Sequence, residues 1–279
     1  TTKTKTTSQS LLPGIILFHT AAGPQDIFLR WKADMLARHF NCVVLIADLF
    51  GDANGWTWDA LSGKNSKEEH DDGTLKKYRD IREKLFSMDK MNDDDSSKPR
   101  YAALENGIRN ALDALQSVEV SFLPIDESNG NLINIKVDPN QIAAMGWCFG
   151  GYPILELARM RVDGIVALLT YHGVFDAILM EEQSSDLVTK TSTSSIATTN
   201  THDNNNNIST KVLICNGKDD PFVSQKQLGM VQKELQQYGC HPILLRNFGN
   251  VRHGFTNPAQ DLNPNKAFGY NESAANESW

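Results

Sequence analysis

Cysteine is scarce in this sequence and shows no pairing pattern. The 279 residues contain four cysteines, spread along the chain without a C-x-x-C pair. We therefore expect reduced thiols in a cytoplasmic protein, with neither a disulfide framework nor a metal site. No apolar run approaches the length of about 20 residues that a membrane-spanning helix needs, so a membrane is not an expected partner.

Positive charge is also in deficit. The 27 Lys and Arg residues are outnumbered by 34 Asp and Glu residues, which gives a net charge of −7. An acidic protein repels phosphate groups, which argues against nucleic acid or an anionic membrane surface as a partner. We also predict no cofactor.

Two stretches lack the apolar residues that form a core. Residues 1–10 are rich in Thr, Ser and Lys and predict a disordered lead-in. Because they contain no acidic residue, the end of an organellar transit peptide is the alternative to a cytoplasmic protein. Residues 182–210 include four consecutive asparagines and predict a disordered polar insertion. We expect a single domain over residues 11–279, interrupted by that insertion.

Elsewhere, continuous apolar runs alternate with helical patterns. Gly14 to His19 and Lys211 to Asn216 are typical of strands that are buried on both faces. The alternation predicts an α/β fold, with a mostly parallel central sheet and helices on both faces. In such sheets the functional residues gather at the C-terminal ends of the strands.

The first helix and the central strand carry more detailed expectations. Asp26 is expected to cap a helix after the first strand. Further along, residues 125–140 predict an irregular connection or a hairpin, and Gln141 to Met145 a short buried strand. The core face of the first helix is predicted to carry Phe28, Trp31, Met35, Leu36 and Phe40.

The sequence around Cys148 has the form G-x-C-x-G. A buried strand leads into it, and a helix is predicted from Ile154, with Pro153 in its first turn. A strand that turns directly into a helix bends sharply at the middle residue, as in a nucleophile elbow, here with cysteine in place of serine. The Phe149 amide would lie at the helix N-terminus and could donate to an oxyanion. The alternative is a small buried cysteine in a tight turn.

An acid and a base follow Cys148 in the order typical of this fold. Of the seven histidines, only His241 and His253 come after a candidate acid. His241 begins its strand, at the wrong end of the sheet, whereas His253 follows the C-terminal end of a strand. Asp219 and Asp220 both follow the strand before; we favour Asp220 and keep Asp219 as the reserve. A helix cap for either aspartate and an exposed loop histidine are the structural alternatives.

Three motifs in this order carry a family resemblance. They are Gly146-Trp147-Cys148-Phe149-Gly150-Gly151, Gly217-Lys218-Asp219-Asp220-Pro221-Phe222-Val223 and His253-Gly254-Phe255-Thr256-Asn257-Pro258. With them, the chain resembles the dienelactone hydrolase family from about Pro13 to its end. The resemblance implies an α/β-hydrolase fold and the hydrolysis of a small lactone or carboxylic ester through a cysteine thioester.

The resemblance also implies a role for each site residue. Cys148 would be the nucleophile, Asp220 the acid and His253 the base. The implied oxyanion hole consists of the amides of Phe149 and Ala21. The residues implied to lie beside the substrate are Thr20, Tyr171, His172 and Asn257.

Two positions depart from the best-known enzymes of that family. Those enzymes carry a glutamate in the first loop that controls the ionisation of the cysteine, and the matching position here is Thr20. They also carry an arginine four residues after the base that helps to hold a substrate carboxylate, and here that position is Asn257. Arg79 or Arg82 could match a second arginine on the helix before the elbow.

The sequence supports three functions in order of preference. The first is a cysteine-dependent hydrolase, the second a non-catalytic scaffold that binds a small molecule, and the third a thiol-based redox protein. The presence of nucleophile, acid and base disfavours the scaffold. The lack of an evident resolving cysteine disfavours the redox protein. The oligomeric state stays unknown.

Overall fold

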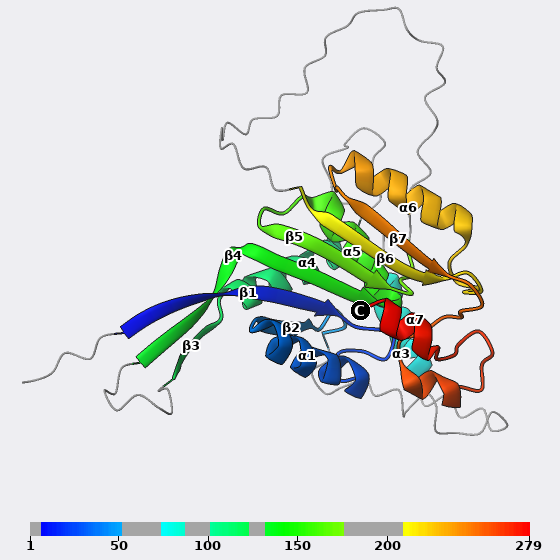
Figure 1. The fold of residues 1–279 in the computed structure, drawn as a ribbon, viewed down its shortest axis with the longest axis horizontal. Helices are drawn as coiled ribbons and strands as arrows, with labels where there is room; N and C mark the ends of the chain where they lie inside the picture. Colours follow the sequence, from blue (N-terminus) through cyan, green and yellow to red (C-terminus); the bar gives the residue numbers. More distant parts are fainter. Residues whose placement is uncertain (1–6, 52–73, 87–100, 123–131, 176–208) are drawn as a thin grey trace, which may run out of the picture.

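The computed structural model describes residues 7–51, 74–86, 101–122, 132–175 and 209–279. In these residues one sheet of seven strands has the order β2-β1-β4-β5-β6-β7, and β3 pairs with β4 outside that path (Figure 1). Every pair is parallel except β3 with β4. The strands are β1 (Thr7–Phe18), β2 (Val43–Ala47), β3 (Glu119–Phe122), β4 (Leu132–Trp147), β5 (Ile165–Tyr171), β6 (Lys211–Gly217) and β7 (Ile243–Phe248).

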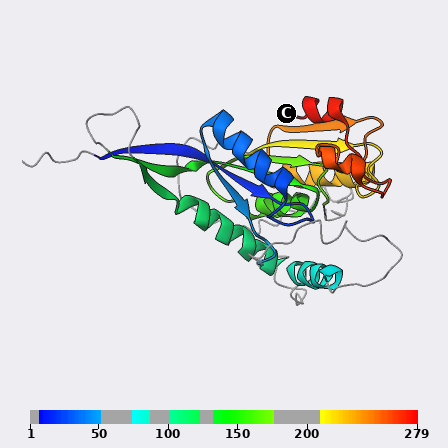
Figure 2. The same ribbon diagram turned by 90° about the horizontal axis from the view of Figure 1, so that it is seen from below.

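Helices cover both faces of this sheet (Figure 2). On one face lie α1 (Ile27–Phe40) and α7 (Glu272–Glu277); on the other lie α4 (Ala102–Gln116), α5 (Gly151–Met160) and α6 (Gln225–Gln237), with α3 (Thr74–Leu85) beside α4. Two short 3-10 helices are η1 (Cys148–Gly150) and η2 (Pro258–Leu262). The predicted α/β architecture is confirmed. No helix in the described ranges is both long and apolar enough to cross a bilayer.

Two apolar cores form because successive side chains of a strand point to opposite faces. In β1, Ile16 and Phe18 face the core beneath α4 and α5, whereas Ile15 and Leu17 face α1. All four are buried. A strand buried on both faces must be apolar at every position, which explains the continuous apolar run in the sequence.

Strands β1 and β4 are longer than the sequence predicts. Thr7 pairs with Leu132 and Gly14 with Ile142, with an irregularity in register between the two regions. Residues 7–10 therefore belong to a strand and not to a disordered lead-in. Likewise, β4 begins at Leu132, so the strand predicted over Gln141 to Met145 is too short. A hairpin-like antiparallel pair of β3 with β4 exists, but β3 precedes the predicted range 125–140, and residues 132–140 of that range belong to β4. Residues 1–6 and 182–208 lie outside the described residues.

Helix α1 buries only part of the predicted face, at Phe28 and Leu36. The Asp26 carboxylate accepts a hydrogen bond from the Phe28 amide at 3.0 Å, which confirms the cap. Trp31 and Phe40, however, are 53% and 58% exposed. A step of four residues turns the helix about 40° beyond a full circle, so Phe40 has rotated away from the face that Phe28 begins. The side chains buried on α1 are Phe28, Leu29, Lys32 and Leu36.

Candidate active site

Cys148 occupies the sharp turn between β4 and α5. Its backbone has φ 53°, a left-handed conformation that side chains rarely adopt and that costs on the order of 1–3 kcal/mol. Glycine is needed on either side, because a Cβ atom on Gly146 would clash with the Gly150 carbonyl, and one on Gly150 would lie 2.5 Å from the Phe18 carbonyl oxygen. The strand-turn-helix geometry is as predicted, although the helix begins at Gly151, after η1, and not at Ile154.

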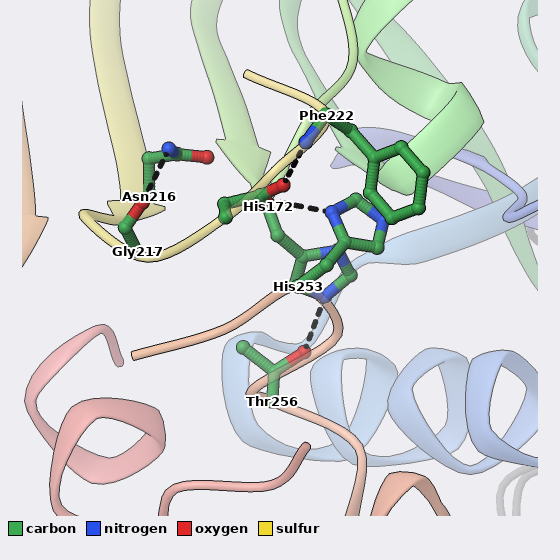
Figure 3. A network of polar contacts seen from close by, with 7 residues as sticks. His172, Asn216, Gly217, Phe222, His253 and Thr256 are labelled. Atoms are coloured by element: carbon green, nitrogen blue, oxygen red, sulfur yellow. Dashed lines mark hydrogen bonds and ion pairs between the residues drawn. The ribbon is translucent and has the colours of Figure 1, made fainter. Parts of the chain in front are cut away.

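His253 and Asp220 form a buried pair beside the turn. The His253 Nδ1 atom lies 2.7 Å from Asp220 Oδ2, and the two residues are 1% and 5% exposed. The second oxygen, Oδ1, accepts a hydrogen bond from the Phe222 amide at 2.9 Å (Figure 3). Asp219 is exposed instead. The structure therefore pairs the histidine with the favoured aspartate and not with the reserve.

The imidazole of His253 also acts on the Cys148 thiol, by its charge and by hydrogen bonding. Burial opposes charge on both groups. It would lower the pKa of His253, but the Cys148 thiolate and the Asp220 carboxylate outweigh it and raise that pKa to about 10. Burial would likewise raise the pKa of the Cys148 thiol, but the charge and the hydrogen bond of His253 hold it below its ordinary value. The favoured state near neutral pH is a thiolate–imidazolium pair.

Two backbone amides face the same sulfur. The N–H groups of Ala21, from the loop after β1, and of Phe149, directly after the nucleophile, donate to Cys148 and help to lower its pKa. A sulfur that accepts these bonds places any carbonyl carbon bound to it next to the same donors. This arrangement could stabilise an oxyanion on that carbon.

Thr20 and Asn257 make local hydrogen bonds. The Thr20 hydroxyl oxygen accepts from the Ala22 amide at 3.1 Å and lies 3.3 Å from Asp26 Oδ2, to which it donates. Asn257 Oδ1 accepts from the Ala259 amide at 3.0 Å and caps η2. Both side chains therefore have structural functions in the loops around the site.

Of the two arginines, Arg82 has a described side chain. It is exposed and donates to the Tyr152 hydroxyl at 3.4 Å, one turn beyond the nucleophile. Arg79 lies in α3, and its side chain is outside the described part of the structure.

Tyr171 and His172 are buried behind the site, each 2% exposed. The Tyr171 ring is stacked between Trp147 and Trp279, with ring centroids 5.2 and 5.7 Å away. His172 packs edge-on against His253 at 4.9 Å, and its Nε2 atom lies 3.0 Å from the Thr256 hydroxyl (Figure 3). Both side chains therefore support the site from within the core, and their position beside a substrate stays a prediction.

Two phenylalanines at the site were missed from the sequence. Phe222 and Phe268 flank the His253 ring, with centroids 4.9 and 5.2 Å away, and lie 5.5 Å from each other. Phe222 is 44% exposed, so it presents apolar surface beside the base. Its position two residues after Asp220 was a usable signal, whereas Phe268 had none because the contact depends on how the last loop folds back.

The remaining cysteines differ from Cys148. All are free, and burial raises the pKa of each thiol, that of Cys215 to about 12. They are therefore poor nucleophiles at neutral pH. Within the described ranges, no group of three or more His, Cys, Asp or Glu side chains could hold a metal ion. The thiols in question are Cys42, Cys215 and Cys240.

Comparison with solved structures agrees with this fold. The chain is similar to a solved protein described as m3DLH, with a TM-score of 0.63 and 25% identity, over 97% of this chain and 83% of that one. It is also similar in fold to a dienelactone hydrolase-like promiscuous phosphotriesterase from metagenomic libraries, with a TM-score of 0.60 and 24% identity, over 99% and 84% of the two chains.

Sequence comparison leads to the same family. The chain is 26% identical over 143 residues to the uncharacterized protein K02A2.1 of Caenorhabditis elegans, which is 51% of this chain and 77% of that protein. The model of the dienelactone hydrolase family matches residues 2–279, nearly the whole chain. The protein therefore belongs to the dienelactone hydrolase family and is a hydrolase with the α/β-hydrolase fold.

Proposed function

We propose that this protein hydrolyses small lactones or carboxylic esters through a thioester on Cys148, with His253 transferring the proton and the Asp220 carboxylate orienting the imidazole. One observation carries the proposal: the His253 imidazole contacts the Cys148 sulfur on one side and the Asp220 carboxylate, at 2.7 Å, on the other. Membership of a hydrolase family supports the same chemistry.

The first half-reaction forms the thioester. The Cys148 thiolate attacks the carbonyl carbon, and the negative charge moves to the carbonyl oxygen, where the amides of Ala21 and Phe149 would stabilise it. The tetrahedral intermediate collapses as the bond to the alcohol oxygen breaks. The His253 imidazolium gives its proton to that oxygen, so the alcohol leaves neutral and the imidazole is left without charge.

The second half-reaction releases the acid. The neutral His253 takes a proton from a water molecule, whose oxygen attacks the thioester carbonyl. Collapse of the second tetrahedral intermediate breaks the carbon–sulfur bond and restores the thiolate beside the imidazolium. Asp220 accepts the hydrogen bond of Nδ1 throughout, which keeps the other ring nitrogen directed at the sulfur.

The thiol-based redox function receives less support. A redox cysteine is usually resolved by a second thiol, and the other three thiols are buried with raised pKa values. A non-catalytic scaffold, in turn, would not require a charged pair beside two backbone donors. The scaffold is one outcome of the following experiment.

The test combines variants with detection of the intermediate. Wild-type protein should hydrolyse p-nitrophenyl acetate and an aromatic lactone, and Cys148→Ala and His253→Ala should each lose about 10³-fold or more in kcat/KM. Acid-quenched wild-type protein should show by mass spectrometry an added acyl group on the peptide that carries Cys148.

The matched control is Cys240→Ala, which removes a buried thiol distant in sequence from the proposed triad and should keep wild-type turnover. Circular dichroism of every variant checks that the fold is intact. Turnover in folded Cys148→Ala equal to that of the wild type would disprove the covalent mechanism. An inactive wild type that still binds esters would favour the scaffold.

A further inference from the structure

His19 lies directly after β1 and is completely buried. The Leu49 amide donates to its Nε2 atom at 3.3 Å, and its Nδ1 atom lies 2.7 Å from the Thr20 carbonyl oxygen. Because an amide can only donate, Nε2 must be the acceptor, so the hydrogen of the neutral ring resides on Nδ1 and is donated to Thr20. The contacts therefore define the tautomer.

The charge of this ring is equally constrained. Burial lowers the pKa of His19 to about 4, although the Thr20 carbonyl and the Asp48 carboxylate act in the opposite direction. Protonation would also place a second N–H against the Leu49 amide, so donor would face donor. His19 is thus neutral over the working range of a thiolate enzyme and is not a second base.

The Thr20 carbonyl, which accepts the hydrogen bond from His19 Nδ1, belongs to the same peptide unit as the Ala21 N–H of the proposed oxyanion hole. The Thr20 carbonyl and the Ala21 N–H share one planar trans peptide, so they point in opposite directions. A donor that holds the carbonyl on one side directs the N–H to the other side, where it meets the Cys148 sulfur. The Gly23 amide, 3.0 Å from the same oxygen, helps to hold it.

The His19 ring also supports the second donor. It is stacked on the Phe149 ring, with centroids 5.7 Å apart and planes 7° from parallel. The Phe50 ring packs edge-on against the His19 ring, with ring centroids 4.4 Å apart. One buried imidazole therefore contacts the Thr20–Ala21 peptide unit, through the Thr20 carbonyl, and the side chain of Phe149, and these two units supply the amides of the proposed hole.

We propose that His19 is a positioning residue, which fixes the Thr20–Ala21 peptide so that its N–H faces the nucleophile. This inference rests on the proposed function for its effect on turnover. Its effect on the thiol does not depend on any substrate. If the peptide rotates, Cys148 loses a donor that stabilises its thiolate, and the oxyanion loses the same donor.

Two variants separate the hydrogen bond from the shape of the ring. His19→Phe keeps a flat ring against Phe149 but removes both hydrogen bonds. His19→Asn places an amide N–H close to the position of Nδ1 and can still donate to Thr20. Phe50→Leu is the packing control, since it changes the other neighbour of the ring and leaves both His19 hydrogen bonds in place.

Two readouts apply to each variant: kcat and KM for p-nitrophenyl acetate, and the rate of iodoacetamide alkylation of Cys148 against pH. His19→Phe should lose about tenfold or more in kcat, less than the 10²–10³-fold cost of removing an oxyanion donor outright, with KM little changed. Its alkylation profile should shift to higher pH. His19→Asn and Phe50→Leu should keep kcat and the alkylation profile close to wild type.

A folded His19→Phe with an unchanged alkylation profile and kcat would overturn the proposal, as would equal losses in His19→Phe and His19→Asn. If His19→Phe does not fold, nitrogen-15 NMR of the wild type decides: a neutral His19 with hydrogen on Nδ1 at pH 7 is expected, and hydrogen on Nε2 would contradict it. If the wild type hydrolyses no ester, the proposed function fails, while the alkylation profiles still test His19.

Discussion

Ionisation of the nucleophile is shared between two side chains. Cys148 is partly buried and His253 is buried, and loss of solvation penalises an isolated charge on either group, yet each supplies the opposite charge that the other needs. Removing one partner should therefore return the other toward its uncharged form. A substitution of either residue therefore changes the ionisation of both groups.

The two adjacent aspartates provide a sharp test of which carboxylate orients the base. Asp220→Asn should lower kcat by about 10²–10⁴-fold, because an amide in place of the carboxylate weakens the bond at Nδ1 and no longer stabilises the imidazolium. Asp219→Asn is the matched control and should change kcat little, because the Asp219 side chain is exposed. The backbone N–H of residue 219, which donates to the Val251 carbonyl at 3.1 Å, is kept in this variant. If steady-state kinetics showed a larger loss of kcat in Asp219→Asn than in Asp220→Asn, Asp219 would be the carboxylate that orients His253.

Thr20 supports a further prediction about the resting thiol. Its hydroxyl bonds the Ala22 amide and Asp26, so it neither competes for His253 nor carries a charge. A Thr20→Glu substitution would add a negative charge next to the Ala21 donor and oppose the thiolate. Alkylation of Cys148 by iodoacetamide should therefore shift to higher pH in Thr20→Glu.

In the wild type, the apparent pKa from alkylation should lie below the free-cysteine value of about 8.5. Labelling reports Cys148 selectively, because the other three thiols are buried and have raised pKa values. Thr20→Val, which keeps the size without the charge, is the control. An identical alkylation profile in Thr20→Glu and the wild type would show that this position does not influence the nucleophile.

Among the elements, the junction of β4 and α5 leaves no room for a side chain at Gly146 or Gly150. Gly150→Ala should destabilise the protein by about 1–3 kcal/mol, because the added Cβ meets the Phe18 carbonyl oxygen at 2.5 Å and backbone must move. Gly229→Ala is the comparison in α6, where nothing lies within 4 Å of the added atom. It should stabilise by about 0.5–1 kcal/mol, through helix propensity.

Urea unfolding followed by circular dichroism measures both glycine substitutions. The expected result is a lower midpoint for Gly150→Ala and a higher midpoint for Gly229→Ala. Because the junction carries Cys148, Gly150→Ala should also lose activity, whereas Gly229→Ala should not. Equal midpoints for the two variants would contradict the close approach of strand and helix at the turn.

For the whole molecule, the charged pair links folding to pH. In the unfolded chain the ordinary pKa values of 6.5 for His253 and 9.0 for Cys148 apply, and the folded protein raises the first to about 10 and lowers the second. Between about pH 6.5 and 9 both states bind one proton in total, so stability from the pair does not vary with pH. Above pH 9 the unfolded thiol loses its proton while folded His253 keeps its own, so stability falls as pH rises toward 10.

The corresponding measurement compares the wild type with the double variant Cys148→Ala/His253→Ala. The free energy of unfolding of the wild type, relative to the double variant, should be greatest between about pH 6.5 and 9. It should decrease in alkaline solution as pH passes the folded pKa of about 10. It should also decrease in acid below pH 6.5, where the unfolded chain binds a second proton. A constant difference from pH 7.5 to 10.5 would contradict the ion pair.

Much of the sheet and the order of the candidate site residues could be predicted from the sequence, for a physical reason. A parallel strand covered on both faces must be apolar along its length, so runs such as the one ending at Phe18 identify it. The glycines around Cys148 reflect a local turn, and His253 could be selected over His241 from its place after a strand. These features depend on neighbours in the chain, and the family model that matches residues 2–279 confirms the family resemblance.

Other properties depend on contacts between distant segments. Asp219 and Asp220 are chemically identical neighbours, and only the direction of the side chains in space decides which one meets His253, 33 residues away in sequence. His19 bonds Leu49 across 30 residues, which no local pattern records. The ionisation state of Cys148 depends entirely on the tertiary structure. Burial, the imidazolium of His253 and two backbone amides act on the sulfur only when the loops that carry them lie together.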